Sequence, residues 1–123
     1  MTECIAFIKV KDLQNTIDWY KEIGFQCSAT NLLWEPECEI NWAKLDFGNA
    51  GFMIGPDERP NIPDEKDVHL WFNIDSIDAM VERLTNFGIS IDIEHATFYG
   101  RKNVSFRDLN GFKVSFSCKL QTV

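Results

Sequence analysis

The chain has 123 residues and a net charge of −7, set by 19 acidic and 12 basic side chains. This charge repels a phosphate backbone, so nucleic acid is not an expected partner. No apolar run approaches the roughly 20 residues that a membrane span needs, so no membrane partner is expected either.

The first residues, MTECIAFIKVKD, lack the basic stretch and the apolar core of a signal peptide, which predicts a cytoplasmic protein. Four cysteines are scattered along the chain without C-x-x-C spacing, and in that compartment we expect free thiols that are mostly buried. They are Cys4, Cys27, Cys38 and Cys118.

The first half of the chain predicts a strand, a helix and three further strands. Residues alternate over 3–10 as in a strand, and apolar side chains then recur at helical spacing until Gly24. Asp12 is the expected N-cap of this helix and Gly24 its expected stop. The stretch 56–66 holds three of the four prolines and is a predicted linker. The three further strands are expected over residues 25–34, 40–47 and 51–54.

The second half repeats this order. Residues 68–74 predict a strand, and the apolar side chains that follow at helical spacing predict a helix that stops at Gly88. Asp75 or Ser76 is the expected cap of this helix. Its further strands are expected over residues 89–93, 102–106 and 112–118.

A shift of 64 residues superposes the two halves, placing Gly24 on Gly88, and indicates an internal duplication. Neither half alone buries more than one sheet face under one helix, so we expect both to share a core. The predicted fold class is α+β, with two βαβββ modules over about 3–55 and 67–119 in a single domain.

Strand alternation separates an apolar face from a mixed face that carries aromatic, cationic and hydroxyl side chains. A plain solvated face rarely needs so many large apolar side chains, so we expect the mixed face to line a partly apolar pocket. Four cations on it are candidates for an anionic ligand, although Asp46 is an equally suitable partner for them. They are Lys9, Lys44, Arg107 and Lys113.

Two segments carry a family resemblance, VKDLQNTIDWYKEIGF over 10–25 and YGRKNVSFRDLNGFKVSF over 99–116. With the duplication, they make the chain similar to the vicinal oxygen chelate superfamily of glyoxalases, bleomycin-resistance proteins and dioxygenases, and most similar to its small bleomycin-resistance-like members. The resemblance implies two βαβββ modules that form an incomplete barrel around a cavity. In this family the cavity is often completed by dimerisation, so a homodimer is implied.

Metalloenzymes of that family hold a divalent ion with side chains from four strands. Carried onto this sequence, the resemblance retains one ligand candidate, His69. Ile5, Met53 and Ser115 stand at the other positions, and such a set does not hold a divalent ion at useful affinity. No metal and no other cofactor is therefore expected.

The leading hypothesis is a protein that binds a small organic molecule in this cavity without metal. The first alternative is a metal-dependent glyoxalase-type lyase, isomerase or dioxygenase whose ligands are displaced by a residue or two, so catalysis is left open. A module that serves only protein interaction is a third possibility. The expected ligand-binding residues are Phe7, Trp42, His69, Trp71, Asn73, Tyr99 and Arg107.

Some aromatic and polar residues are expected outside this pocket. His95 lies near Tyr99 and Arg101 in an expected turn, and we expect it to be an exposed loop residue. Trp19 on the first helix and Trp34 in the loop after it are expected to be exposed, which favours the homodimer.

Overall fold

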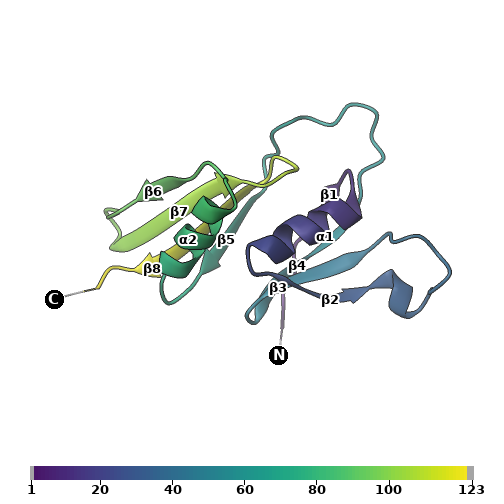
Figure 1. Ribbon diagram of the computed structural model, residues 1–123, viewed down its shortest axis with the longest axis horizontal. Coiled ribbons are helices and arrows are strands. Elements are labelled where there is room, and N and C mark those ends of the chain that lie inside the picture. The colour runs from purple at the N-terminus through teal and green to yellow at the C-terminus, as the bar shows by residue number, and fades with distance from the viewer. Residues whose placement is uncertain (1, 122–123) are drawn as a thin grey trace. The chain divides into compact units, whose positions relative to one another are not determined.

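The computed structural model describes residues 2–121. The chain divides into two units, Met1–Ile62 and Pro63–Val123, and each contains one helix against a four-stranded sheet (Figure 1). Within residues 2–121, no helix has both the length and the apolar character needed to cross a membrane.

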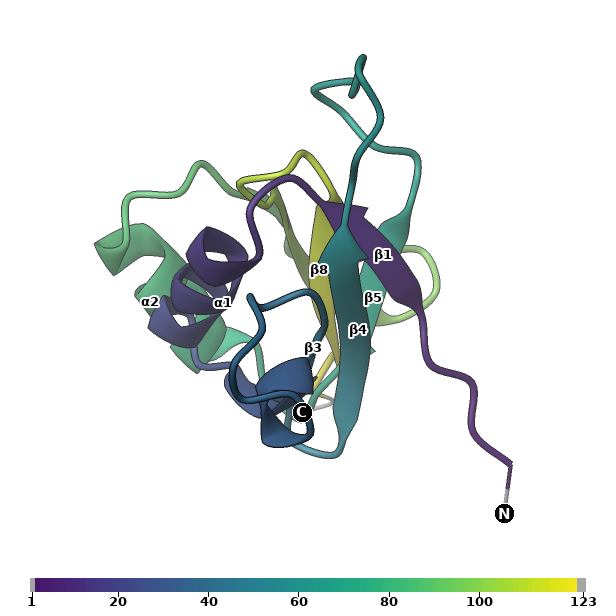
Figure 2. The same ribbon diagram turned by 90° about the vertical axis from the view of Figure 1, so that its right-hand side faces the viewer.

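The first unit runs in the order strand, helix and three strands. Its sheet has the strand order β1-β4-β3-β2, with β1 parallel to β4 and the other pairs antiparallel. Figure 2 shows β1 lying beside β4. The elements are β1 Phe7–Val10, α1 Leu13–Glu22, β2 Gln26–Thr30, the 3-10 turn Asn31–Leu33, β3 Ala43–Phe47 and β4 Ala50–Pro56.

The second unit repeats this topology with the strand order β5-β8-β7-β6, and again its first and last strands are parallel. The repeat confirms the predicted α+β class with two βαβββ modules. The elements are β5 His69–Asn73, α2 Asp78–Asn86, β6 Asp92–Glu94, β7 Arg101–Arg107 and β8 Lys113–Lys119.

The caps of the two helices differ. Asp12 caps α1 as predicted, since its Oδ1 accepts a hydrogen bond from the Asn15 N–H at 3.0 Å. In α2 the N-cap is Ile77, which makes no side-chain cap bond, so the prediction of Asp75 or Ser76 at this position was wrong. Ser76, the residue before this N-cap, accepts a hydrogen bond with its Oγ from the Asp78 N–H at 3.3 Å.

Each helix buries an apolar stripe against its own sheet. In the first unit the Tyr20 ring packs edge-on against Phe25 and Phe52, with centroids 5.0 and 5.2 Å apart. In the second, Phe116 stacks on Phe72 at 5.1 Å and lies 6.2 Å from Phe106. That the two units share one core stays a prediction.

Several predicted strands are shorter or displaced. The first begins at Phe7 rather than at Glu3, and the residues from Glu3 to Ala6 are exposed and outside any strand. The segment 25–34 ends as a strand at Thr30, where the 3-10 turn begins. The segment 89–93 contributes only the start of β6, which begins at Asp92. In each of these segments the residue pattern predicts a strand, but part of the segment lies outside the strand in the structure.

Three further expectations concern burial, and two of them fail. The four cysteines are free, but only Cys118 is buried, whereas Cys4 and Cys38 are exposed. Trp19 is half-buried, with its ring packed edge-on against Tyr20. The prediction for Trp34 is confirmed, since it is 69% exposed.

Candidate functional site

The open face of the second sheet carries a row of side chains from β5, β7 and β8. Along β5, Leu70 and Phe72 turn toward the core, so His69, Trp71 and Asn73 point the other way. The parallel pairing of β5 with β8 places Ser115 beside Trp71, and Ser117 beside Asn73. Antiparallel β7 adds Ser105 opposite Ser115, and Arg107 opposite Lys113.

A chain of hydroxyl groups crosses this face. Ser115 is fully buried, and its Oγ lies 2.6 Å from His69 Nε2 and 2.6 Å from Ser105 Oγ. Three neighbouring strands are therefore joined by side-chain hydrogen bonds. The chain fixes the Ser105 hydroxyl at one end and the His69 imidazole at the other.

The electrostatic surroundings of His69 favour its neutral form. Burial, together with the positive charges of Lys113 and Arg107, lowers the pKa of His69 below its ordinary value. The imidazole therefore stays neutral to a lower pH than a free histidine, and it is a hydrogen-bonding group rather than a cation near neutral pH.

A second network fixes the Trp71 ring. Its indole N–H donates to Asn73 Oδ1 at 2.9 Å, and the ring lies edge-on to His69 at 5.6 Å. Arg101 donates from its guanidinium to Asn73 Oδ1 at 3.2 Å and to Ser117 Oγ at 2.6 Å. Trp71 is nevertheless 43% exposed, so one part of the ring is available for contact.

Arg101 is the residue of this face that the sequence analysis missed. The predicted strand starts one residue later, at Lys102, but Arg101 is the first residue of β7 and is half-buried. Strand alternation could have placed Arg101 on this face, because it has the same parity along β7 as Ser105 and Arg107. A predicted strand that starts at Lys102 leaves Arg101 out of this pattern.

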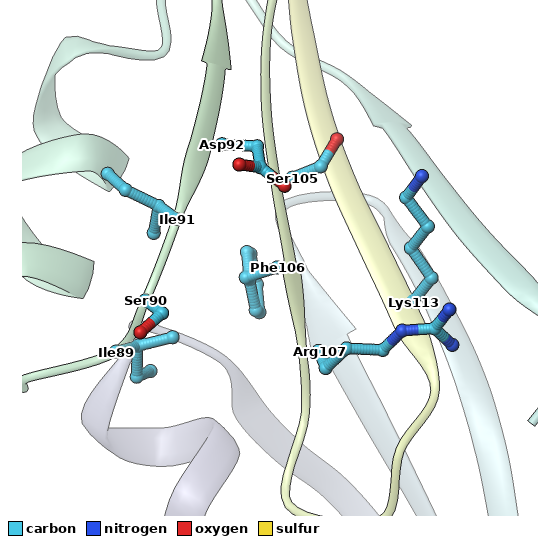
Figure 3. Close-up of a pocket in the computed structure, with 8 residues that line it drawn as sticks. All are labelled: Ile89, Ser90, Ile91, Asp92, Ser105, Phe106, Arg107 and Lys113. Carbon is cyan, nitrogen blue, oxygen red and sulfur yellow. The ribbon is translucent and has the colours of Figure 1, made fainter. Parts of the chain in front are cut away.

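A pocket of about 400 Å³ lies next to the hydroxyl chain, between β6 and the ends of β7 and β8 (Figure 3). Its wall combines two cationic side chains, a carboxylate and two hydroxyl groups. Two isoleucines and a phenylalanine form its apolar part. The lining residues are Ile89, Ser90, Ile91, Asp92, Ser105, Phe106, Arg107 and Lys113.

The open face of the first sheet is more apolar. Phe7 is half exposed and its ring lies against Gly55, where a side chain would collide with it. Met53 lies beside Phe7 in the parallel pairing. One cation of this face, Lys44, forms an ion pair with Asp46 at 3.1 Å.

Trp42 precedes β3 and lies with Trp34 in a separate pocket of about 520 Å³. The two indole rings are 6.2 Å apart. Asn31 holds this loop, because its Oδ1 accepts from the Asn41 and Trp42 N–H groups, and its amide donates to the Glu39 carbonyl. Trp42 therefore lines a loop pocket rather than the sheet face itself.

The remaining expected site residues lie in the second unit. Tyr99 precedes β7, and its hydroxyl accepts from Asn103 Nδ2 at 2.9 Å. Arg107 donates to the carbonyls of Gly111 and Lys66, at 2.9 and 3.2 Å. The second sheet thus brings His69, Trp71, Asn73 and Arg107 onto one face, whereas Phe7 and Trp42 belong to the other unit.

Comparison with known proteins gives a family and several similar folds. The family model of the glyoxalase/bleomycin resistance protein/dioxygenase superfamily matches residues 5–116. The chain belongs to this superfamily. No curated protein matches the sequence. The family predicted from the two sequence segments is confirmed.

Solved structures of this superfamily type share the fold at low identity. TioX from Micromonospora sp. ML1 has 18% identity and a TM-score of 0.76, with 99% of each chain covered. A bleomycin-binding protein complexed with bleomycin has 12% identity and a TM-score of 0.76, covering 97% of this chain and 99% of its own. FosX from Listeria monocytogenes, complexed with Mn(II) and sulfate, has 14% identity and a TM-score of 0.70, covering 99% and 91%.

The superfamily includes metalloenzymes, but the donor set of this member does not fit a divalent ion. His69 Nε2 is engaged by Ser115, and the charges nearest to the imidazole are the cations Lys113 and Arg107. Ile5, at the first-strand ligand position, precedes β1 and offers no donor atom. Among residues 2–121, no three His, Cys, Asp or Glu side chains gather in a way that could hold a metal ion.

Proposed function

We propose that this superfamily member binds a small organic molecule on the open face of its second sheet, without a metal ion. The observation that carries the proposal is Trp71, an aromatic ring that is 43% exposed yet hydrogen-bonded through its own indole N–H. A fixed ring offers a stacking surface at little entropic cost, because its orientation is set before the ligand arrives.

The groups around Trp71 support polar recognition of the same ligand. His69 and Asn73 flank it on β5, and both are held by further hydrogen bonds, to Ser115 and Arg101 respectively. Ligand pockets commonly combine an apolar surface with a few fixed polar groups, and this face has that composition. The bleomycin-binding protein of the same fold, which was solved with its ligand, is consistent with such a role.

We expect Trp71→Ala to weaken binding of a ligand found by thermal-shift screening at least about tenfold, as truncation of a central aromatic does. A compound that binds only the native state must raise the melting temperature, so the screen itself reports binding. Isothermal titration then gives the affinity of the parent and the variant. The ligands to screen are aromatic, glycopeptide and thiol-adduct compounds.

Phe98→Ala is the matched control, because Phe98 is an aromatic of the same unit that is 100% exposed and outside the sheet face. It should leave the affinity unchanged. Equal losses in both variants would remove the case for Trp71. Binding that requires added Mn(II), or stoichiometric metal in the purified protein, would contradict the metal-free proposal.

We further propose a homodimer in the cytoplasm. Leu33 and Trp34 are 73% and 69% exposed, which is more apolar surface than such a short loop needs for folding. Sedimentation at micromolar concentration should give twice the chain mass, and Trp34→Glu should shift the protein toward the monomer. A parent protein that sediments as a monomer would contradict the dimer. The free thiols are consistent with a reducing compartment.

A further inference from the structure

Two cations lie directly opposite each other in the second sheet. Arg107 and Lys113 are register partners on antiparallel β7 and β8, an arrangement in which like charges destabilise the pair. Arg107 is partly compensated by Glu65 at 3.7 Å. Lys113 forms no hydrogen bond or ion pair with any of residues 2–121. The fold therefore keeps two cations side by side in a chain whose net charge is −7.

These cations share the pocket of about 400 Å³ with fixed hydroxyl groups (Figure 3). The Ser105 hydroxyl lines the pocket and is oriented from behind by the buried Ser115. Arg107 is held by two backbone carbonyls, so its guanidinium is also placed in advance. Guanidinium, ammonium and hydroxyl groups that line one pocket are the donors that suit a carboxylate or phosphate group.

Two other cations of the open faces are engaged within their own sheets. Lys44 is paired with Asp46 at 3.1 Å, and Arg101 donates to Ser117 and Asn73. Lys113 and Arg107 are the two cations that line this pocket, and Lys113 is the one of them without an ion pair in the part of the chain that the structure describes.

We infer that the pocket beside β6 binds the anionic group of a small organic molecule, with Lys113, Arg107 and Ser105 as its contacts. This inference rests on the proposed function and names the chemical class of its ligand. Asp92 lies in the same pocket wall and repels a second negative charge, so the ligand is a monoanion. Ile89 and Ile91 supply an apolar surface for the body of the molecule.

The test uses benzoate as the probe and its neutral isostere benzamide as the comparison. In ¹⁵N-labelled parent protein, benzoate should shift the amide resonances of Ser105, Arg107 and Lys113, and benzamide should bind about tenfold more weakly because it lacks the charge-assisted bonds. Lys113→Met should lower benzoate affinity about tenfold, with the rest of the spectrum preserved because this side chain is exposed.

Lys119→Met is the control, because it removes the same charge from the same strand outside the pocket. It should change benzoate affinity less than about twofold, as expected for a distant screened charge. Equal affinities for benzoate and benzamide, or an unchanged affinity in Lys113→Met, would overturn the anion site. If the screen still yields a ligand that depends on Trp71, the proposed function survives that result. A screen that yields no ligand, together with no binding of benzoate, overturns both.

Discussion

Phe116→Ala is expected to lower the free energy of unfolding by about 3–5 kcal/mol, the usual range for truncating a buried phenylalanine. Phe116 is fully buried and its ring stacks between Phe72 on β5 and Phe106 on β7. Alanine leaves a cavity between two rings on β5 and β7, the two strands that flank β8 and pair with it. Those strands cannot close on it without breaking their ladder hydrogen bonds, so little of the loss is recovered by relaxation.

Urea unfolding followed by circular dichroism measures this change. Phe98→Ala removes the same atoms from a ring that is 100% exposed and should stay within about 0.5 kcal/mol of the parent. A loss below about 1 kcal/mol for Phe116→Ala would show that this packing is not the core of the second unit.

Gly111→Ala is expected to be the second most damaging single change, with a loss of several kcal/mol that exceeds backbone strain alone. Gly111 has φ of +87°, where a side chain costs about 1–2 kcal/mol. Its Cβ would also overlap the carbonyl oxygen of Asp64, which is backbone and cannot rotate away. Relief requires the turn to separate from the segment at Lys66, whose N–H bonds to the Gly111 carbonyl at 3.0 Å.

Gly100→Ala separates these two costs. Gly100 lies in the same unit with φ of +77°, and a Cβ there meets nothing within 4 Å. Denaturant unfolding should give only the strain of about 1–2 kcal/mol for Gly100→Ala. Equal losses for the two variants would contradict the clash. Because the Gly111 carbonyl also receives Arg107, the Gly111 variant alone should weaken benzoate binding.

The regular elements could be predicted because their causes are local. Asp12 and Gly24 delimit the first helix through a cap bond and a positive φ of 102°, and both signals are legible in the sequence. Pairing of strands is not local, which is why strand ends were misplaced. β1 pairs with β4 only from Phe7, opposite Met53, although β4 itself begins at Ala50.

The sequence predicts which residues share the face of the site better than it predicts which of them are bonded to one another. Alternation placed His69, Trp71 and Arg107 on a mixed face, because side-chain direction in a strand follows from sequence position. It could not tell which cations are neutralised. That depends on cross-strand neighbours such as Asp46 beside Lys44, and on the rotamers that bring Arg101 to Asn73. The proposed anion site therefore follows from the three-dimensional contacts of these cations and not from the sequence pattern.

The parallel pairing of first and last strands in each unit affects the order in which the chain can fold during synthesis. The first unit has all of its strands once Pro56 has been made. In the second unit β5 is an edge strand whose one neighbour is β8, so the first strand waits for residues up to Lys119. Until β8 is available, Phe72 on β5 lacks both its strand partner and the Phe116 ring that stacks on it, so this long-range parallel pair closes late in the folding of the second unit.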